Sequence, residues 1–137
     1  MEPRVKLTAI FPVSAKKIYD SWLNSNAHSS FASGKAEINP RNGFPFTLQN
    51  GYMTGTNLVL QPFGRIVQSL RAADFPEGAN DSRLELLFEE HNSGTKLTLI
   101  HSQLPNGEEK KFEKFWKENY LKSMREYFRQ TKPVKKA

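Results

Sequence analysis

Apolar residues fall on one broad face of the segment 106–129 when it is read at ~100° per residue. They are Phe112, Phe115, Trp116, Tyr120, Met124, Tyr127 and Phe128, six of which are aromatic. The pattern predicts a long C-terminal helix whose aromatic face must be covered by the rest of the chain. Asn106 is predicted as its N-cap, with Glu109 as the capping-box partner.

Before this helix, apolar and polar residues alternate in short runs. Residues 4–11 read as a strand, with Val5, Leu7, Ala9 and Phe11 on one side. Ser14 is expected to cap a short helix over residues 15–23, and residues 24–33 form either a second short helix or a compact loop. Further strands are predicted between turn residues, at 35–38, 44–48, 52–60, 65–72, 83–89 and 96–102.

This order predicts an α+β domain in two layers, with a curved antiparallel sheet of about seven strands wrapped around the long C-terminal helix. Two short helices follow the first strand. A chain of 137 residues fits one core. We expect a single domain over residues 1–130 and a basic, disordered tail over residues 131–137.

Composition and charge narrow the possible partners. Net charge is +6, but the surplus gathers at the C-terminus, in Arg129, Lys132, Lys135 and Lys136, so we expect no nucleic-acid partner. The chain has no cysteine, no apolar leader at its start and no run long enough to span a membrane. We therefore expect a soluble cytoplasmic protein.

The three histidines show no metal-ligand spacing, and we expect no metal and no cofactor. His28 and His91 are predicted to be exposed. His101 shares a strand face with Leu97 and Leu99, so it is either a hydrogen-bonded core histidine or a polar group that projects into a ligand cavity. No Gly-x-Ser-x-Gly motif or phosphate-binding glycine loop is present, and no catalytic residue is assigned.

Gln68 alternates with Ile66 and Leu70, so its side chain is predicted to point inward as theirs do. It is either a hydrogen-bonded core group or a contact to a bound polar atom. The aromatic face of the helix also has two interpretations, core or pocket wall. If a cavity exists between sheet and helix, its predicted lining is Gln68, Leu70, Phe88, Leu99, His101, Phe112, Trp116, Tyr120 and Met124.

Several stretches together resemble a known family. They are Gly51-Tyr52-Met53-Thr54-Gly55, residues 65–71 (RIVQSLR) with 72–78 (AADFPEG), Gly94-Thr95-Lys96-Leu97-Thr98-Leu99, and the final Trp116, Tyr120, Met124, Tyr127 and Phe128. This ordered set, over about residues 4–129, is similar to homologues of the activator of heat-shock protein 90 ATPase, in the START-like, Bet v 1-like (SRPBCC) helix-grip superfamily. The resemblance implies a seven-stranded antiparallel sheet gripping the C-terminal helix.

The resemblance also carries expectations about function. Superfamily members bind lipids, hormones and polyketides under the helix, and a few are enzymes. Many relatives carry Trp where this chain has Leu70, which implies a larger cavity or a more deeply settled helix. Eukaryotic co-chaperones of the family have a separate N-terminal domain before a domain of this kind, and we expect this chain to lack it.

Three functions follow, in order of preference. The first is a non-enzymatic module that holds a small apolar ligand, a lipid or an aromatic compound, between sheet and helix. The second is a co-chaperone-like regulator that binds heat-shock protein 90 and stimulates its ATPase. The third is a cyclase-like or hydrolase-like enzyme with His101 as base.

Overall fold

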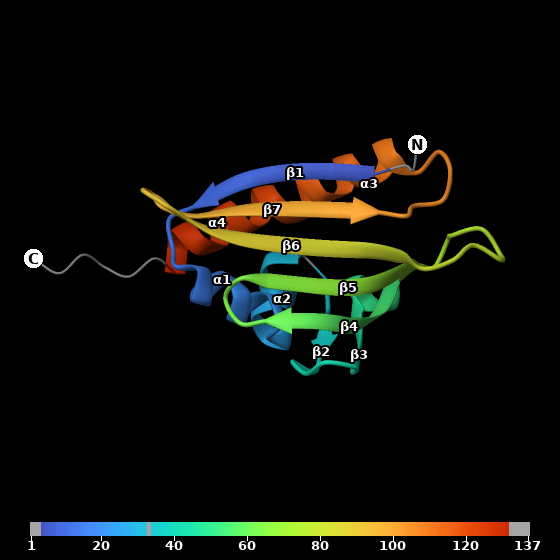
Figure 1. The fold of residues 1–137 in the computed structure, drawn as a ribbon, viewed down its shortest axis with the longest axis horizontal. Coiled ribbons are helices and arrows are strands. Elements are labelled where there is room, and N and C mark those ends of the chain that lie inside the picture. Colours follow the sequence, from blue (N-terminus) through green and yellow to red (C-terminus); the bar gives the residue numbers. More distant parts are fainter. Residues whose placement is uncertain (1–3, 33, 132–137) are drawn as a thin grey trace, which may run out of the picture.

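A computed structural model describes residues 4–32 and 34–131, which form a curved seven-stranded antiparallel sheet with a long C-terminal helix across one face (Figure 1). The sheet order is β1-β7-β6-β5-β4-β3-β2. Its strands are β1 (Arg4–Phe11), β2 (Glu37–Ile38), β3 (Pro45–Leu48), β4 (Met53–Gln61), β5 (Arg65–Ala72), β6 (Ser82–His91) and β7 (Gly94–Ser102). The α+β, helix-grip prediction is confirmed, including the number of strands.

Two short helices connect β1 to the rest of the sheet. Helix α1 (Ala15–Trp22) begins where Ser14 accepts a hydrogen bond from the Lys17 N–H at 3.1 Å, the capping interaction predicted for this serine. Helix α2 (Ser25–Ala32) occupies the segment for which helix and loop were both open. Both helices bury one face against the core, through Ile18, Trp22 and Phe31 among others.

The C-terminal helix consists of α3 (Glu109–Phe115), a π-helical stretch η2 (Trp116–Leu121) and α4 (Lys122–Thr131). The capping prediction is wrong, because the helix begins at Glu109 with Glu108 as N-cap and without a side-chain capping bond. Gly107 lies between Asn106 and this cap with φ of 85°, a left-handed conformation that turns the chain and leaves Asn106 outside the helix.

Two irregularities shape the β2 edge of the sheet. Pro45 pairs with Thr56 of β4 but lies beyond the end of β2, so its missing N–H costs the sheet no ladder bond. The register of β4 against β5 shifts between Asn57 and Val59, which marks a β-bulge. The bulge leaves Leu58 largely exposed and keeps Asn57 on the inner face.

One core lies between the sheet and the helices. The buried residues of the C-terminal helix include five spaced four apart, none of them more than 1% exposed, namely Phe112, Trp116, Tyr120, Met124 and Phe128. Within the described residues, no helix combines the length and apolar character that crossing a bilayer requires. The helix continues through Thr131, the first residue of the predicted tail, and residues 132–137 lie outside the described part.

Candidate functional site

The nine residues predicted to line a cavity lie together in the core between sheet and helix. None is more than 7% exposed, and Leu99, His101, Trp116, Tyr120 and Met124 are fully buried. Strands β5, β6 and β7 contribute the first five of them and the C-terminal helix the other four. The inward orientation predicted for Gln68 and His101 is therefore observed.

His101 is held by a chain of three hydrogen bonds. The Trp116 indole N–H donates to its Nδ1 at 3.0 Å, so Nε2 carries the proton of the neutral ring and donates to the Ser82 hydroxyl at 2.7 Å. Ser82 in turn donates to the carbonyl oxygen of Leu70 at 2.7 Å. Burial lowers the pKa of His101 to about 3, so the ring stays neutral at physiological pH.

A second buried chain runs through Gln68. Its Oε1 accepts from the Trp22 indole N–H at 3.3 Å, and its Nε2 donates to Oδ1 of Asn57 at 2.9 Å. The Asn57 amide then donates to the carbonyl oxygens of Asn39 and Arg41 at 2.8 and 3.0 Å. Gln68 is thus a hydrogen-bonded core group, and it connects a helix α1 tryptophan to the turn before β3.

His28 corrects the sequence prediction, because it is fully buried rather than exposed. Its Nδ1 donates to the Trp22 carbonyl oxygen at 2.8 Å, so its Nε2 accepts from the Tyr120 hydroxyl, also at 2.8 Å. Burial lowers the pKa of His28 to about 4 and raises that of the Tyr120 hydroxyl. Asn26 and Ser30 of α2 are exposed, as the composition suggested, whereas His28 and Phe31 share the inner side of the helix.

These hydrogen-bond networks limit the acid–base chemistry that the two buried histidines can perform. Both ring nitrogens of His101 and of His28 are engaged by protein groups, which leaves neither ring a free nitrogen for proton transfer to a substrate. Within the described residues, no group of three or more His, Asp or Glu side chains is placed to hold a metal ion.

The pockets described for the chain lie outside this core. One lies between α1, α2 and α4, one beside β2 and β3, one between β2 and the turn at Asn50, and one between the loops 78–80 and 103–106. None of these four is lined by any of the nine predicted residues, Leu70 included. The packing around Leu70 thus favours a settled helix over an enlarged cavity, and ligand binding in the interior stays a prediction.

The outer face of the sheet, which we define by the strand residues that alternate with the buried ones, faces away from the helices (Figure 1). Its basic residues are Arg4, Lys6, Arg65, Arg71, Arg83 and Lys96, and its acidic residues on the same strands are Glu85 and Glu89. Glu85 accepts from Arg65 at 2.7 Å and from Arg83 at 3.2 Å. Lys6 and Lys96 form no ion pair within the described part of the chain.

Sequence reasoning missed Asn57, although its alternation with Met53 and Gly55 placed it on the inner face of β4. In the sheet it pairs directly with Gln68. The sequence signal that could have identified Asn57 was a polar residue on the apolar face of one strand, opposite the polar Gln68 on the next.

Comparison with known proteins identifies a family whose model matches most of the chain. The model of the family described as Activator of Hsp90 ATPase homolog 1-like protein matches residues 12–129. An activator of 90 kDa heat shock protein ATPase homolog from Dictyostelium discoideum is 27% identical over 125 residues, covering 90% of this chain and 32% of that protein. An uncharacterized protein from Schizosaccharomyces pombe is 25% identical, with 86% of this chain and 35% of that protein covered. The chain therefore spans about a third of the length of these relatives.

Solved structures agree on the fold. An HSP90 activator from Plasmodium falciparum superposes with a TM-score of 0.81 at 20% identity, covering 88% of this chain and 92% of that one. The Aha1 dimer from Colwellia psychrerythraea gives a TM-score of 0.80 at 15% identity, covering 95% and 98%. At these identities the likeness concerns the architecture alone.

Proposed function

We propose, because the chain belongs to the family of Activator of Hsp90 ATPase homolog 1-like proteins, that it is a non-enzymatic cytoplasmic module that binds a heat-shock protein 90 chaperone and modulates its ATPase. The Dictyostelium relative and the Plasmodium structure carry names that refer to this chaperone. The packed interior supports a function exercised at the surface, since the buried polar groups of the core are bonded to one another.

The outer face of the sheet is the observation that carries this proposal. Lys6 and Lys96 are free of ion pairs within the described part, and basic side chains outnumber acidic ones across β1, β5, β6 and β7. A protein surface on which one sign of charge predominates associates faster with an oppositely charged surface, and the charge orients the two proteins as they meet. We therefore assign this face to docking on an acidic surface of the chaperone.

Titration calorimetry and a coupled ATPase assay with the purified chaperone test the proposal. We expect measurable binding, with a change in ATP turnover that saturates at the same protein concentration. Absence of heat and of any ATPase change at ~0.1 mM protein would refute it.

Charge reversal tests the assigned face. The double variant Lys6→Glu with Lys96→Glu is expected to weaken binding at least about tenfold, and more at low salt. The matched control, Lys114→Glu with Lys122→Glu, changes the same charge on the exposed side of the C-terminal helix and is expected to bind as the wild type does. Equal weakening by both pairs would remove the assignment to this face.

A second candidate is the binding of a small apolar ligand, which the pocket beside β2 and β3 favours. Its volume is about 390 Å³, and its lining includes Ile38, Pro45 and the core residue Phe46. Native mass spectrometry and thermal shift with palmitate and naphthalene derivatives test this candidate. A stoichiometric adduct that Phe46→Ala abolishes supports it, and an unchanged mass and Tm with every compound ends it.

A further inference from the structure

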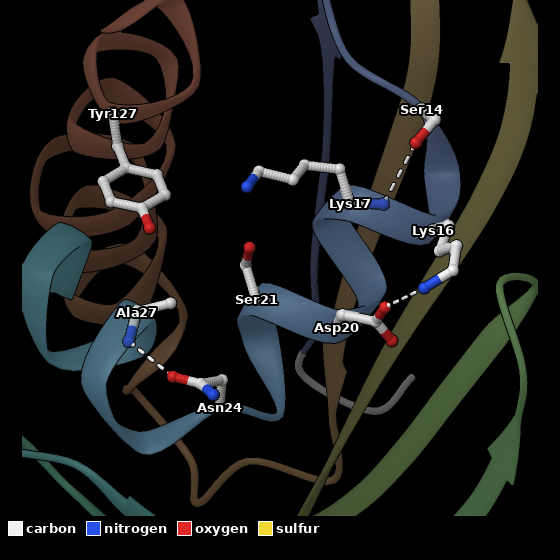
Figure 2. A pocket seen from close by; sticks show the side chains of 8 residues that line it. All are labelled: Ser14, Lys16, Lys17, Asp20, Ser21, Asn24, Ala27 and Tyr127. Carbon is white, nitrogen blue, oxygen red and sulfur yellow. Dashed lines mark hydrogen bonds and ion pairs between the residues drawn. The ribbon is translucent and has the colours of Figure 1, made fainter. Parts of the chain in front are cut away.

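A polar cleft lies between α1, α2 and α4, on the helical side of the molecule and away from the basic sheet face. Figure 2 shows the side chains that line it, from the start of α1 to Tyr127 of α4. Its volume is about 490 Å³, and it is open to solvent. Most of the residues that line it belong to three helices, with Ser14 and Asn24 at helix ends, so helix packing sets its width.

Three polar groups point into this cleft toward one another. Lys17 and Ser21 are one helical turn apart on α1, and the Tyr127 hydroxyl reaches them from α4 (Figure 2). Within the described part of the chain, none of the three side chains forms a hydrogen bond or ion pair. The Tyr127 ring is held by edge contacts to Phe31 and Phe128 at 5.6 and 5.1 Å between ring centroids, which fix the direction of its hydroxyl.

Ser21 is the most informative of the three, because it is only 6% exposed and its hydroxyl has no partner among the described residues. The helix α2 serines behave differently. Ser29 and Ser30 donate to the carbonyl oxygens four residues before them, at 2.7 and 3.0 Å. The Ser21 hydroxyl is reached by solvent through the open cleft, where it can exchange water for a bound group. The direction of the Ser21 hydroxyl into the cleft therefore leaves it available to a bound group.

The remaining lining groups favour an anion. Lys16 is neutralised by Asp20 at 2.7 Å, so the rim adds little net charge. Asn24 uses its Oδ1 to accept from the Ala27 N–H at 2.9 Å, which leaves its amide N–H groups available. The free groups are thus an ammonium, two hydroxyls and an amide donor, a set that matches the oxygens of a small oxyanion.

We infer that this cleft binds the phosphate or carboxylate group of a small molecule, held by Lys17, Ser21 and Tyr127. The ammonium supplies the charge and the two hydroxyls supply directed hydrogen bonds. This site is separate from the sheet face assigned to the chaperone, and its occupancy does not depend on that assignment.

Two-dimensional ¹H–¹⁵N NMR titration tests the inference, with inorganic phosphate and acetate as probes and with sodium chloride at matched ionic strength as the reference. We expect saturable shifts that centre on residues 17, 21, 24, 27 and 127, with a dissociation constant on the order of millimolar for so small a probe. The tighter of the two probes identifies the oxyanion class, phosphate or carboxylate.

Variants give the decisive comparison. Lys17→Gln is expected to weaken binding at least tenfold, and Ser21→Ala and Tyr127→Phe several-fold each. The control Lys114→Gln removes the same charge from an exposed position on α3 and is expected to leave the dissociation constant unchanged. Because Lys17 is exposed, its variant is expected to keep the wild-type spectrum even if Ser21→Ala alters the packing of α1.

Shifts that chloride reproduces, that spread over the basic sheet face, or that Lys17→Gln leaves intact would each overturn the inference. A chain that binds the chaperone but neither probe would overturn this site and leave the proposed function standing.

Discussion

Trp116 and His101 are joined by a hydrogen bond of 3.0 Å from the indole N–H to Nδ1 of the imidazole, in the middle of the core. An indole nitrogen only donates, so the bond decides which imidazole nitrogen carries the proton. His28 is bound in the opposite sense, because its Nδ1 faces a backbone carbonyl oxygen, which only accepts. Two buried histidines in one core therefore have different tautomers.

Long-range ¹H–¹⁵N NMR correlation is expected to show His101 protonated at Nε2 and His28 protonated at Nδ1 at pH 7. The same tautomer for both buried rings would contradict the hydrogen-bond assignments of both networks.

Stability is expected to fall as the pH is lowered from about 6.5 to 4.5. Burial lowers the pKa of His28 to about 4 and that of His101 to about 3, whereas both titrate near 6.5 in an unfolded chain. Between these values the unfolded state binds more protons, so the stabilisation is complete above pH 6.5 and is lost as the pH falls. Each ring contributes a slope that approaches about 1.4 kcal/mol per pH unit.

Urea unfolding at pH 7, 6 and 5 measures this dependence. His91→Gln provides the control, since it removes an exposed histidine and leaves both buried hydrogen-bond networks intact. A free energy of unfolding that stays flat from pH 7 to pH 5 would show that the two rings are not buried and neutral.

Gln68→Leu is expected to destabilise the fold by ~2–4 kcal/mol. The substitution replaces the inward-facing amide with an apolar side chain and leaves the Trp22 indole N–H and the Asn57 side chain without their partners in the core. Gln61→Leu makes the same chemical change at an exposed position at the end of β4, where we expect a change within ~0.5 kcal/mol. Chemical denaturation compares the two, and equal losses would mean that the buried network contributes nothing specific.

Gly55→Ala is expected to be among the most damaging single changes in the sheet, at ~3 kcal/mol or more. A Cβ at this position would overlap the Ser69 carbonyl oxygen on the neighbouring strand and the Phe46 ring. Gly64→Ala is the matched control, because the nearest atoms to its Cβ would be 3.9 Å away. Thermal unfolding is expected to show a large drop in Tm for the first variant and little change for the second.

The sequence pattern predicted correctly which side chains point into the core, but it did not predict which groups they hydrogen-bond. Alternation placed Gln68 and His101 on inner faces, and the helical spacing placed Trp116 and Tyr120 opposite them. The bonds themselves join positions as far apart as 28 and 120, and the distance between such positions follows only from how the sheet curves. No local pattern carries that information.

His28 and Lys17 show two further limits. The segment around His28 is rich in serine and asparagine, so its composition indicated solvent, although α2 turns this one ring inward. The cleft at Lys17 and Ser21 was absent from the predicted site, even though their spacing of four residues on a capped helix placed them on one side. The third member, Tyr127, had been assigned to the apolar face, because its ring and its hydroxyl lie in different surroundings.

The π-helical stretch in the C-terminal helix affects how far a row of side chains can follow the sheet. In a helix of 3.6 residues per turn, each step of four residues overshoots a full turn by ~40°, so Phe128 would point ~160° away from Phe112. The stretch η2 winds more slowly and recovers part of this overshoot between Trp116 and Leu121. The π-helical turn thus reduces the angular drift along the helix, so that five large side chains of one helix point into the same core.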